Sequence, residues 1–180
     1  MTALSGHERA VDIAAFNDSE AAEFERELRP LIGDAVRLAT GLLMNAVEAE
    51  DAVQEACLRA WRRRGNRRDE TDLRPWFLGI VANQCRETRR NRWWRVLRTA
   101  EGPLGRTVAE PHLAARMDLR IALAGLRLRT RLAVVLRYYL DLPYEEVDSV
   151  MGCSIDAAKA LVRRGTAELS LALREGGPEQ

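Results

Sequence analysis

Residues 142–169, LPYEEVDSVMGCSIDAAKALVRRGTAEL, decide the fold of the second half of this chain, because they predict two helices joined by a tight turn. Gly152 can adopt the left-handed conformation that ends a helix, and Ser154 can cap the helix that follows. Apolar side chains on the two helices can face each other: Val147, Val150, Met151, Ile155, Ala158 and Val162. The pattern is typical of a helix-turn-helix, whose second helix enters the DNA major groove. An ordinary helical hairpin would show it too.

The net charge of +1 conceals three blocks of different sign. Residues 1–57 have a net charge of −8, residues 58–106 of +9 and residues 107–180 of 0. The middle block is therefore the candidate surface for a polyanion such as a nucleic acid. Of the 28 basic residues only Lys159 is a lysine, and arginine binds phosphate and guanine edges better than lysine does. A GC-rich genome would produce the same bias.

The most basic stretch also contains two adjacent tryptophans, Trp93 and Trp94. Arginines surround them: Arg86, Arg89, Arg90, Arg92, Arg95 and Arg98. Arginines can neutralise phosphates and aromatic rings can stack on unpaired bases, so the stretch indicates contact with nucleic acid. The alternative is a solvated helix end whose tryptophans pack on a neighbouring domain.

Length and composition exclude several classes of protein. The 180 residues allow one large or two small domains, and no apolar stretch approaches the roughly 20 residues that span a bilayer. The N-terminus lacks the basic start and apolar core of a signal peptide, so we expect a cytoplasmic protein. The three cysteines (Cys57, Cys85 and Cys153) are widely spaced and distant from both histidines, which favours reduced, buried thiols over a disulfide framework or a metal site.

Helical periodicity without strand-like alternation predicts an all-α protein of two small helical domains. After an N-terminal tail over residues 1–18, the first domain spans residues 19–98, and Pro30 either kinks or divides its first helix. Further helices are expected near residues 48–64 and from residues 73–75 onward. A flexible linker rich in glycine and proline follows over residues 99–115. The second domain, residues 116–176, contains the helix-turn-helix.

The helix EAEDAVQEACLRAWRR, residues 48–63, has an apolar stripe and a charged outer face. The outer face carries Glu50, Asp51, Gln54, Glu55 and Arg59. Taken alone, such a face is most simply explained as solvated surface.

Three motifs in the same order resemble the extracytoplasmic-function (ECF) sigma factors of the sigma-70 family. EAEDAVQEACLRAW resembles the helix that grips the polymerase clamp. LRPWFLGIVANQCRETRRNR, residues 73–92, resembles the promoter-melting segment, whose recurring residues here are Trp76, Ile80, Asn83, Glu87 and Arg90. Residues 126–169 resemble the domain that reads the −35 element. The resemblance covers roughly residues 20–175.

The resemblance implies a role for each surface. The partners are core RNA polymerase (clamp and flap) and promoter DNA, with an anti-sigma factor plausible, no cofactor and no membrane. The implied polymerase-binding residues are Glu50, Asp51, Gln54, Glu55 and Arg59. The implied −10 contacts are Asn66, Arg67, Arg68, Asp69, Trp76, Asn83, Arg86, Arg89 and Arg90. The implied −35 contacts are Arg129, Arg131, Ser154, Ala157, Lys159, Arg163 and Arg164.

The sequence also departs from the family. Arg127 and Leu128 replace the usual prolines before the arginine-rich turn. In the recognition helix, Ala157 and Ala158 stand where the family usually has a threonine and a valine, and Leu161 stands where it often has an arginine, whereas Lys159 and Arg164 match the family. Asp156 adds a negative charge near the DNA, so we expect little direct base reading at −35.

Two other classes of protein could share parts of this pattern. A helix-turn-helix repressor or activator would need only the C-terminal domain and would leave the acidic helix unexplained. An enzyme acting on nucleic acid would need paired carboxylates with a metal, or a nucleophile with a base. The sequence contains no HxxxH motif, Cys/His cluster or glycine-rich phosphate loop. We therefore expect an initiation factor without chemistry of its own.

Overall fold

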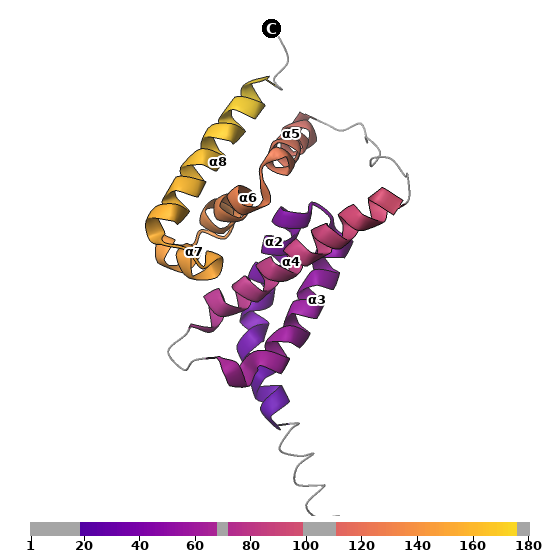
Figure 1. The fold of residues 1–180 in the computed structure, drawn as a ribbon, viewed down its shortest axis with the longest axis vertical. Coiled ribbons are helices and arrows are strands. Elements are labelled where there is room, and N and C mark those ends of the chain that lie inside the picture. Colours follow the sequence, from indigo (N-terminus) through magenta and orange to yellow (C-terminus); the bar gives the residue numbers. More distant parts are fainter. Residues whose placement is uncertain (1–18, 68–71, 99–110, 176–180) are drawn as a thin grey trace, which may run out of the picture.

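The computed structural model describes residues 19–67, 72–98 and 111–175, and every regular element within these ranges is helical (Figure 1). The predicted all-α class is therefore confirmed, with helical regions on both sides of residues 99–110. Within the same ranges, no helix is long and apolar enough to cross a bilayer.

The N-terminal region consists of a helix over residues 19–28, α2 (Ile32–Leu43), α3 (Ala46–Arg63) and α4 (Leu73–Arg98). Short 3-10 turns occupy Arg29–Leu31 and Arg64–Asn66. Pro30 lies in the first of these turns, so the proline divides the helix rather than kinking it. The helices α2, α3 and α4 pack on one another around fully buried side chains, the largest being Phe77, Leu38, Leu42, Leu78 and Val81.

A tight corner connects α2 to α3. Met44 has a φ of 57°, a left-handed conformation that ends α2. The side chain of Asn45 accepts a hydrogen bond from the backbone N–H of Glu48 (3.1 Å) and so caps α3. The helix α3 therefore begins two residues before the predicted start at residue 48.

The C-terminal region consists of α5 (Pro111–Gly125), α6 (Leu128–Val134), the π-helical turn η3 (Val135–Tyr139), α7 (Tyr144–Met151) and α8 (Ile155–Glu175). Gly152 has a φ of 59° and ends α7 as predicted. The hydroxyl of Ser154 accepts a hydrogen bond from the N–H of Ala157 (3.3 Å), which caps α8. The predicted turn and its two flanking helices are thus confirmed.

The predicted linker is too long at its C-terminal end. Helix α5 starts at Pro111, a residue type suited to the first turn because proline has no N–H to satisfy. Residues 111–115 are therefore helical, whereas residues 99–110 lie outside the described residues. The sequence did not reveal where α5 begins, because the glycines and prolines of residues 99–111 favour a loop.

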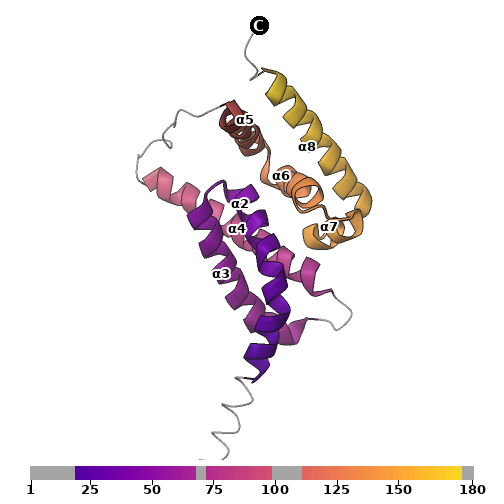
Figure 2. The ribbon, with the colours of Figure 1, turned by 180° about the vertical axis from the view of Figure 1, so that it is seen from behind.

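The two helical regions lie against each other. Helix α7 packs on α4, while α6 and η3 pack on α2 (Figures 1 and 2). A single apolar cluster joins them, with Leu38 and Phe77 from the N-terminal region and Leu136 and Val147 from the C-terminal region. The sequence predicted two domains but not this shared core.

Candidate nucleic-acid interface

The charged outer face of α3 is a solvent-exposed surface. Glu50, Asp51 and Gln54 are exposed and Glu55 is half-buried, whereas Ala49, Ala52, Val53 and Ala56 form the opposite, buried face. We call Glu50, Asp51, Gln54 and Glu55 the docking face. It combines negative charge with a fixed helical support, which suits a positively charged protein partner.

Two exposed apolar residues extend the docking face at its ends. Val47 is 69% exposed and Leu58 is 51% exposed. Their spacing from Asp51 and Gln54, in steps of three and four residues, places all four on one side of α3. The interface predicted from the sequence did not include them. Apolar residues in register with a charged face were the available signal, and they are typical of a protein interface rather than of plain solvated surface.

Arg59, predicted to contact the polymerase, has partners within the chain. Its Nη2 lies 2.7 Å from Oε2 of Glu87 on α4, and its Nε lies 3.5 Å from Oε1 of Glu55. The hydrogen bond from Arg59 lowers the pKa of Glu87 below its ordinary value. The guanidinium therefore links α3 to α4.

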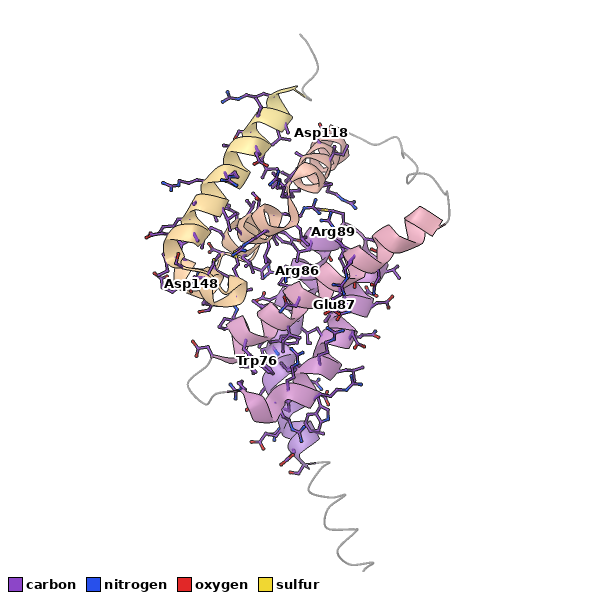
Figure 3. The ribbon with its side chains drawn as sticks, viewed as in Figure 1. Trp76, Arg86, Glu87, Arg89, Asp118 and Asp148 are labelled. Carbon is purple, nitrogen blue, oxygen red and sulfur yellow. The ribbon has the colours of Figure 1, made fainter. Side chains whose placement is uncertain are left out.

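The predicted −10 contacts on α4 lie along one side of that helix. Trp76 is half-buried, Asn83 and Arg86 are exposed, and Arg86 Nη1 donates to Asn83 Oδ1 (2.9 Å; Trp76 and Arg86 are labelled in Figure 3). All three line a cavity of about 670 Å³. An indole, an amide and a guanidinium can together stack on a base, hydrogen-bond its edge and bind its phosphate. We call Trp76, Asn83 and Arg86 the −10 face.

The opposite wall of this cavity belongs to the C-terminal region. It is formed by Leu132 of α6, by Ser149, Val150 and Met151 of α7, and by Gly152. The −10 face therefore shares a cavity with the helix-turn-helix, although Asn83 and Arg86 remain exposed to solvent.

The remaining predicted −10 contacts are less fully described. Arg67 and Arg89 are half-buried and Arg90 is exposed. The backbone of Asn66 lies in a 3-10 turn, and Arg68 and Asp69 lie outside the described residues. The same holds for the side chains of Arg92, Trp93, Trp94, Arg95 and Arg98, although the backbone of α4 continues through them.

Helix α8 presents a polar face to solvent. Ser154, Asp156, Lys159, Arg163 and Arg164 are exposed, Ala157 is half-buried, and Ala158 is buried against the core. The ammonium of Lys159 lies 5.7 Å from the ring centroid of Tyr144 on α7, within the range of a cation–π contact. Arg129, in the first turn of α6, is also exposed.

Arg131 does not lie on the predicted DNA-binding surface. Arg131 is only 3% exposed, and its guanidinium donates hydrogen bonds to the carbonyls of Leu42, Ala124 and Leu126. Burial, and to a lesser extent the positive charge of Arg89, lowers the pKa of Arg131 to about 10. In this arrangement no phosphate can reach it, so the assignment of Arg131 to −35 DNA is corrected.

Two family models match separate parts of the chain. Residues 25–95 match the family model for sigma-70 region 2, and residues 116–169 match that for sigma-70 region 4. The ECF RNA polymerase sigma factor EcfG of Rhodopseudomonas palustris is 30% identical over 145 residues, which cover 78% of this chain and 80% of that protein. The RNA polymerase sigma-E factor of Streptomyces coelicolor is 27% identical over 156 residues, covering 83% and 85%.

Solved structures share the fold. The sigma factor RpoE of Bartonella quintana, in complex with the anti-sigma factor NepR, superposes with a TM-score of 0.70 at 23% identity, covering 86% of this chain and 99% of that one. CnrH, in complex with the cytosolic domain of CnrY, gives a TM-score of 0.65 at 21% identity, covering 86% and 89%.

An acidic docking face, an arginine-rich helix and a helix-turn-helix together define a DNA-binding protein with a second, protein-binding surface. The chain belongs to the ECF sigma factors of the sigma-70 family, and its function is that of a promoter-recognising sigma factor of RNA polymerase.

Proposed function

We propose that the docking face on α3 binds the clamp of core RNA polymerase, that the −10 face on α4 captures non-template bases of the −10 element, and that α8 binds the −35 element. Helix α8, together with Arg129, supplies the −35 contacts, and the C-terminal region also contacts the flap. The observation that carries the proposal is the separation of these surfaces. The residues of the docking face are exposed or half-buried, and none of them lines the cavity that holds the −10 face.

The expected chemistry of each contact follows from its residues. Bases of the opened strand can stack on Trp76 and donate or accept hydrogen bonds at Asn83, because unpaired bases expose edges that a duplex hides. Arg86 and Arg90 are exposed, and their guanidinium groups can neutralise phosphates. Nucleotide addition belongs to the polymerase, so we propose that the chain is an initiation factor and not an enzyme; we also propose that it acts in the cytoplasm, where its polymerase partner transcribes.

An anti-sigma factor is a further proposed partner. The structurally similar RpoE is bound to the anti-sigma factor NepR. In this chain, the half-buried groove lined by Phe24, Leu28, Ile32, Leu58 and Trp61 offers an apolar surface beside the docking face. A partner that covered it would compete with the polymerase.

Reconstituted holoenzyme tests the proposal. The chain should bind core polymerase with one-to-one stoichiometry and direct run-off transcription, mapped genome-wide, from a defined set of starts. A repressor or activator would bind duplex promoter DNA without polymerase, and a nucleic-acid enzyme would convert its substrate without polymerase. Absence of stable binding to core polymerase would refute the proposal.

A further inference from the structure

We propose that Arg64 is a positioning residue for −10 recognition, because its side chain, held by Glu20 and Trp61, fixes the turn that carries Asn66 and Arg67. We call Glu20, Trp61 and Arg64 the turn anchor. The inference rests on the proposed function in taking Asn66 and Arg67 as −10 contacts. In this role Arg64 does not touch a base and acts only through the residues that follow it.

The guanidinium of Arg64 makes three contacts that fix its orientation. Its Cζ lies 3.5 Å from the centroid of the Trp61 ring, over the face of the indole. Its Nη2 lies 2.8 Å from Oε2 of Glu20, and its Nη1 donates to the backbone carbonyl of Trp61 (3.0 Å). A guanidinium presents a flat face and a rigid fork of donors at the same time, which the ammonium of lysine does not. The site therefore selects arginine.

The backbone of Arg64 links the end of α3 to the −10 contacts. Its N–H donates to the carbonyl of Trp61 and so closes the last turn of α3, whose final carbonyls lack partners within the helix. The carbonyl of Arg64 accepts a hydrogen bond from the N–H of Arg67 (3.2 Å), which closes the 3-10 turn. A displacement of Arg64 therefore moves the backbone of Asn66 and Arg67.

The first helix of the N-terminal region supports the turn anchor. Glu20 is 44 residues from Arg64 in the sequence and lies on the helix over residues 19–28. Phe24, one turn further along that helix, has its ring centroid 5.7 Å from that of Trp61, with the ring planes tilted by 54°. This separation is typical of an attractive aromatic pair. The first helix therefore holds both the indole and the guanidinium of the anchor.

Exposure indicates that the anchor orients the turn more than it stabilises the fold. The side chains of Arg64 and Glu20 are 34% and 40% exposed, and ion pairs at such positions contribute little to the free energy of folding. Arg63 lines the cavity of the −10 face, whereas Arg64 is not among its lining residues. The charge of Arg64 is thus used within the chain, while its backbone leads directly into the −10 contacts.

Accurate placement of the turn matters because base recognition depends on direction. Hydrogen bonds weaken steeply when their angle falls below about 120°, so a shift of the turn lowers the preference for the correct base. Phosphate contacts position the protein without specifying sequence, and they can persist after such a shift. We therefore expect loss of the anchor to relax −10 preference while promoter binding through the other surfaces continues.

A promoter library randomised at −10 and transcribed by the holoenzyme tests the role of Arg64. Arg64→Ala should lower the preference for the best −10 sequence over its point variants at least about five-fold, the loss expected when one base contact is weakened. Preferences at −35 should stay as in the wild type. Arg62→Ala is the matched control, because Arg62 is an exposed arginine at the same end of α3. Arg64→Lys keeps the charge but loses the flat face, so its preference should lie between those of the wild type and Arg64→Ala.

Glu20→Gln tests the anchor from the first helix, with Glu23→Gln at an exposed position of the same helix as its control. It should relax −10 preference in the same direction. The effects of Glu20→Gln and Arg64→Ala should be less than additive, because both remove the same contact. In the free chain, amide hydrogen exchange at Arg67 should accelerate in both variants and in neither control.

The outcomes separate this proposal from the proposed function. Unchanged −10 preferences in folded Arg64→Ala and Glu20→Gln, or an equal loss of transcription from every library member, would overturn the role of Arg64 and leave the proposed function intact. A wild-type holoenzyme without −10 preference would overturn both. Thermal unfolding checks that each variant is folded, and Glu20→Gln carries the test if Arg64→Ala is not.

Discussion

Arg59 on α3 and Glu87 on α4 form an ion pair, with Nη2 of the arginine 2.7 Å from Oε2 of the glutamate. Arg59 also approaches Glu55 of the docking face at 3.5 Å. The positive charge is therefore already compensated within the chain, and the docking face keeps the net negative charge of its acids. We infer that Arg59 orients α3 on α4 and that the acids supply the attraction to polymerase.

The docking prediction follows from this division. The double change Asp51→Arg and Glu55→Arg should weaken binding to core polymerase by about 2–4 kcal/mol, because like charge would replace complementary charge at the interface. Arg59→Ala should reduce the free energy of binding to core polymerase by less than half of that amount. Titration of labelled core polymerase would measure the three dissociation constants.

The matched control for docking is the pair Glu23→Arg and Glu27→Arg. Both residues are exposed acids four positions apart on the helix over residues 19–28. This double variant should bind polymerase like the wild type, and thermal unfolding should show that both double variants remain folded. Unfolding of the Asp51/Glu55 variant would mean that these residues are structural.

A second prediction concerns acid stability. Partial burial raises the pKa of Asp34, but hydrogen bonds from Arg37 and Arg74 outweigh it, so the net shift is below the ordinary value of 3.8. The contribution of Asp34 to stability is therefore complete above that value and is lost as the pH falls through the lowered pKa.

Urea denaturation of Asp34→Asn as a function of pH tests this assignment. The free energy of unfolding should fall by about 1.5–3 kcal/mol at pH 7, the typical value for a hydrogen bond to a charged group. The difference from the wild type should shrink below about pH 4. Asp51→Asn, at an exposed position, should differ little from the wild type at either pH. A constant difference for Asp34→Asn across the range would contradict the ion-pair explanation.

Local signals made the helix-turn-helix predictable from the sequence. Gly152 and Ser154 act within one turn of their own position, and both behave as expected. Asn45 is a cap residue of the same kind, yet the predicted start of α3 lay beyond it. The site of Arg131 could not be predicted in this way, because its partner Leu42 lies 89 residues away and only the packing of the two regions brings them together. The −10 face was identified from its residue types, but the position of α7 across the same cavity required the tertiary structure.

A third prediction concerns Gly165, which lies where α8 crosses α6. A Cβ at this position would clash with Cγ2 of Val134 and would lie 2.9 Å from Cγ2 of Thr130. Gly165→Ala should therefore destabilise the C-terminal region by about 1–3 kcal/mol through overpacking, even though alanine favours a helix by about 1 kcal/mol. Ala167→Gly, at an exposed position of the same helix, should cost only about 1 kcal/mol. Equal or greater stability of Gly165→Ala in thermal unfolding would show that the two helices can move apart without cost.

The last prediction asks which region supplies base specificity. Good bidentate contacts to a base discriminate by about 1–3 kcal/mol, whereas phosphate contacts position the protein without specifying sequence. On α8, Ala158 is buried, Ala157 is small, and the hydroxyl of Ser154 is used in the helix cap. Lys159 and Arg163 remain as exposed cations suited to phosphate. We therefore expect shape and phosphate contact to dominate at −35.

The −10 side offers more groups that can read bases, including Asn83, Arg67 and the exposed Asp72. Point changes in the −10 element should thus reduce transcription more than point changes in the −35 element. Lys159→Ala should weaken binding to all −35 variants by a similar factor and lower the salt slope by about 1, as expected for a lost phosphate contact. Alanine at Arg67 or Asp72 should instead relax base preference at −10. A promoter library transcribed by the holoenzyme distinguishes direct base reading by α8 from binding through shape and phosphate contact. Sharp −35 preferences that disappear in Lys159→Ala would mean that α8 reads bases directly.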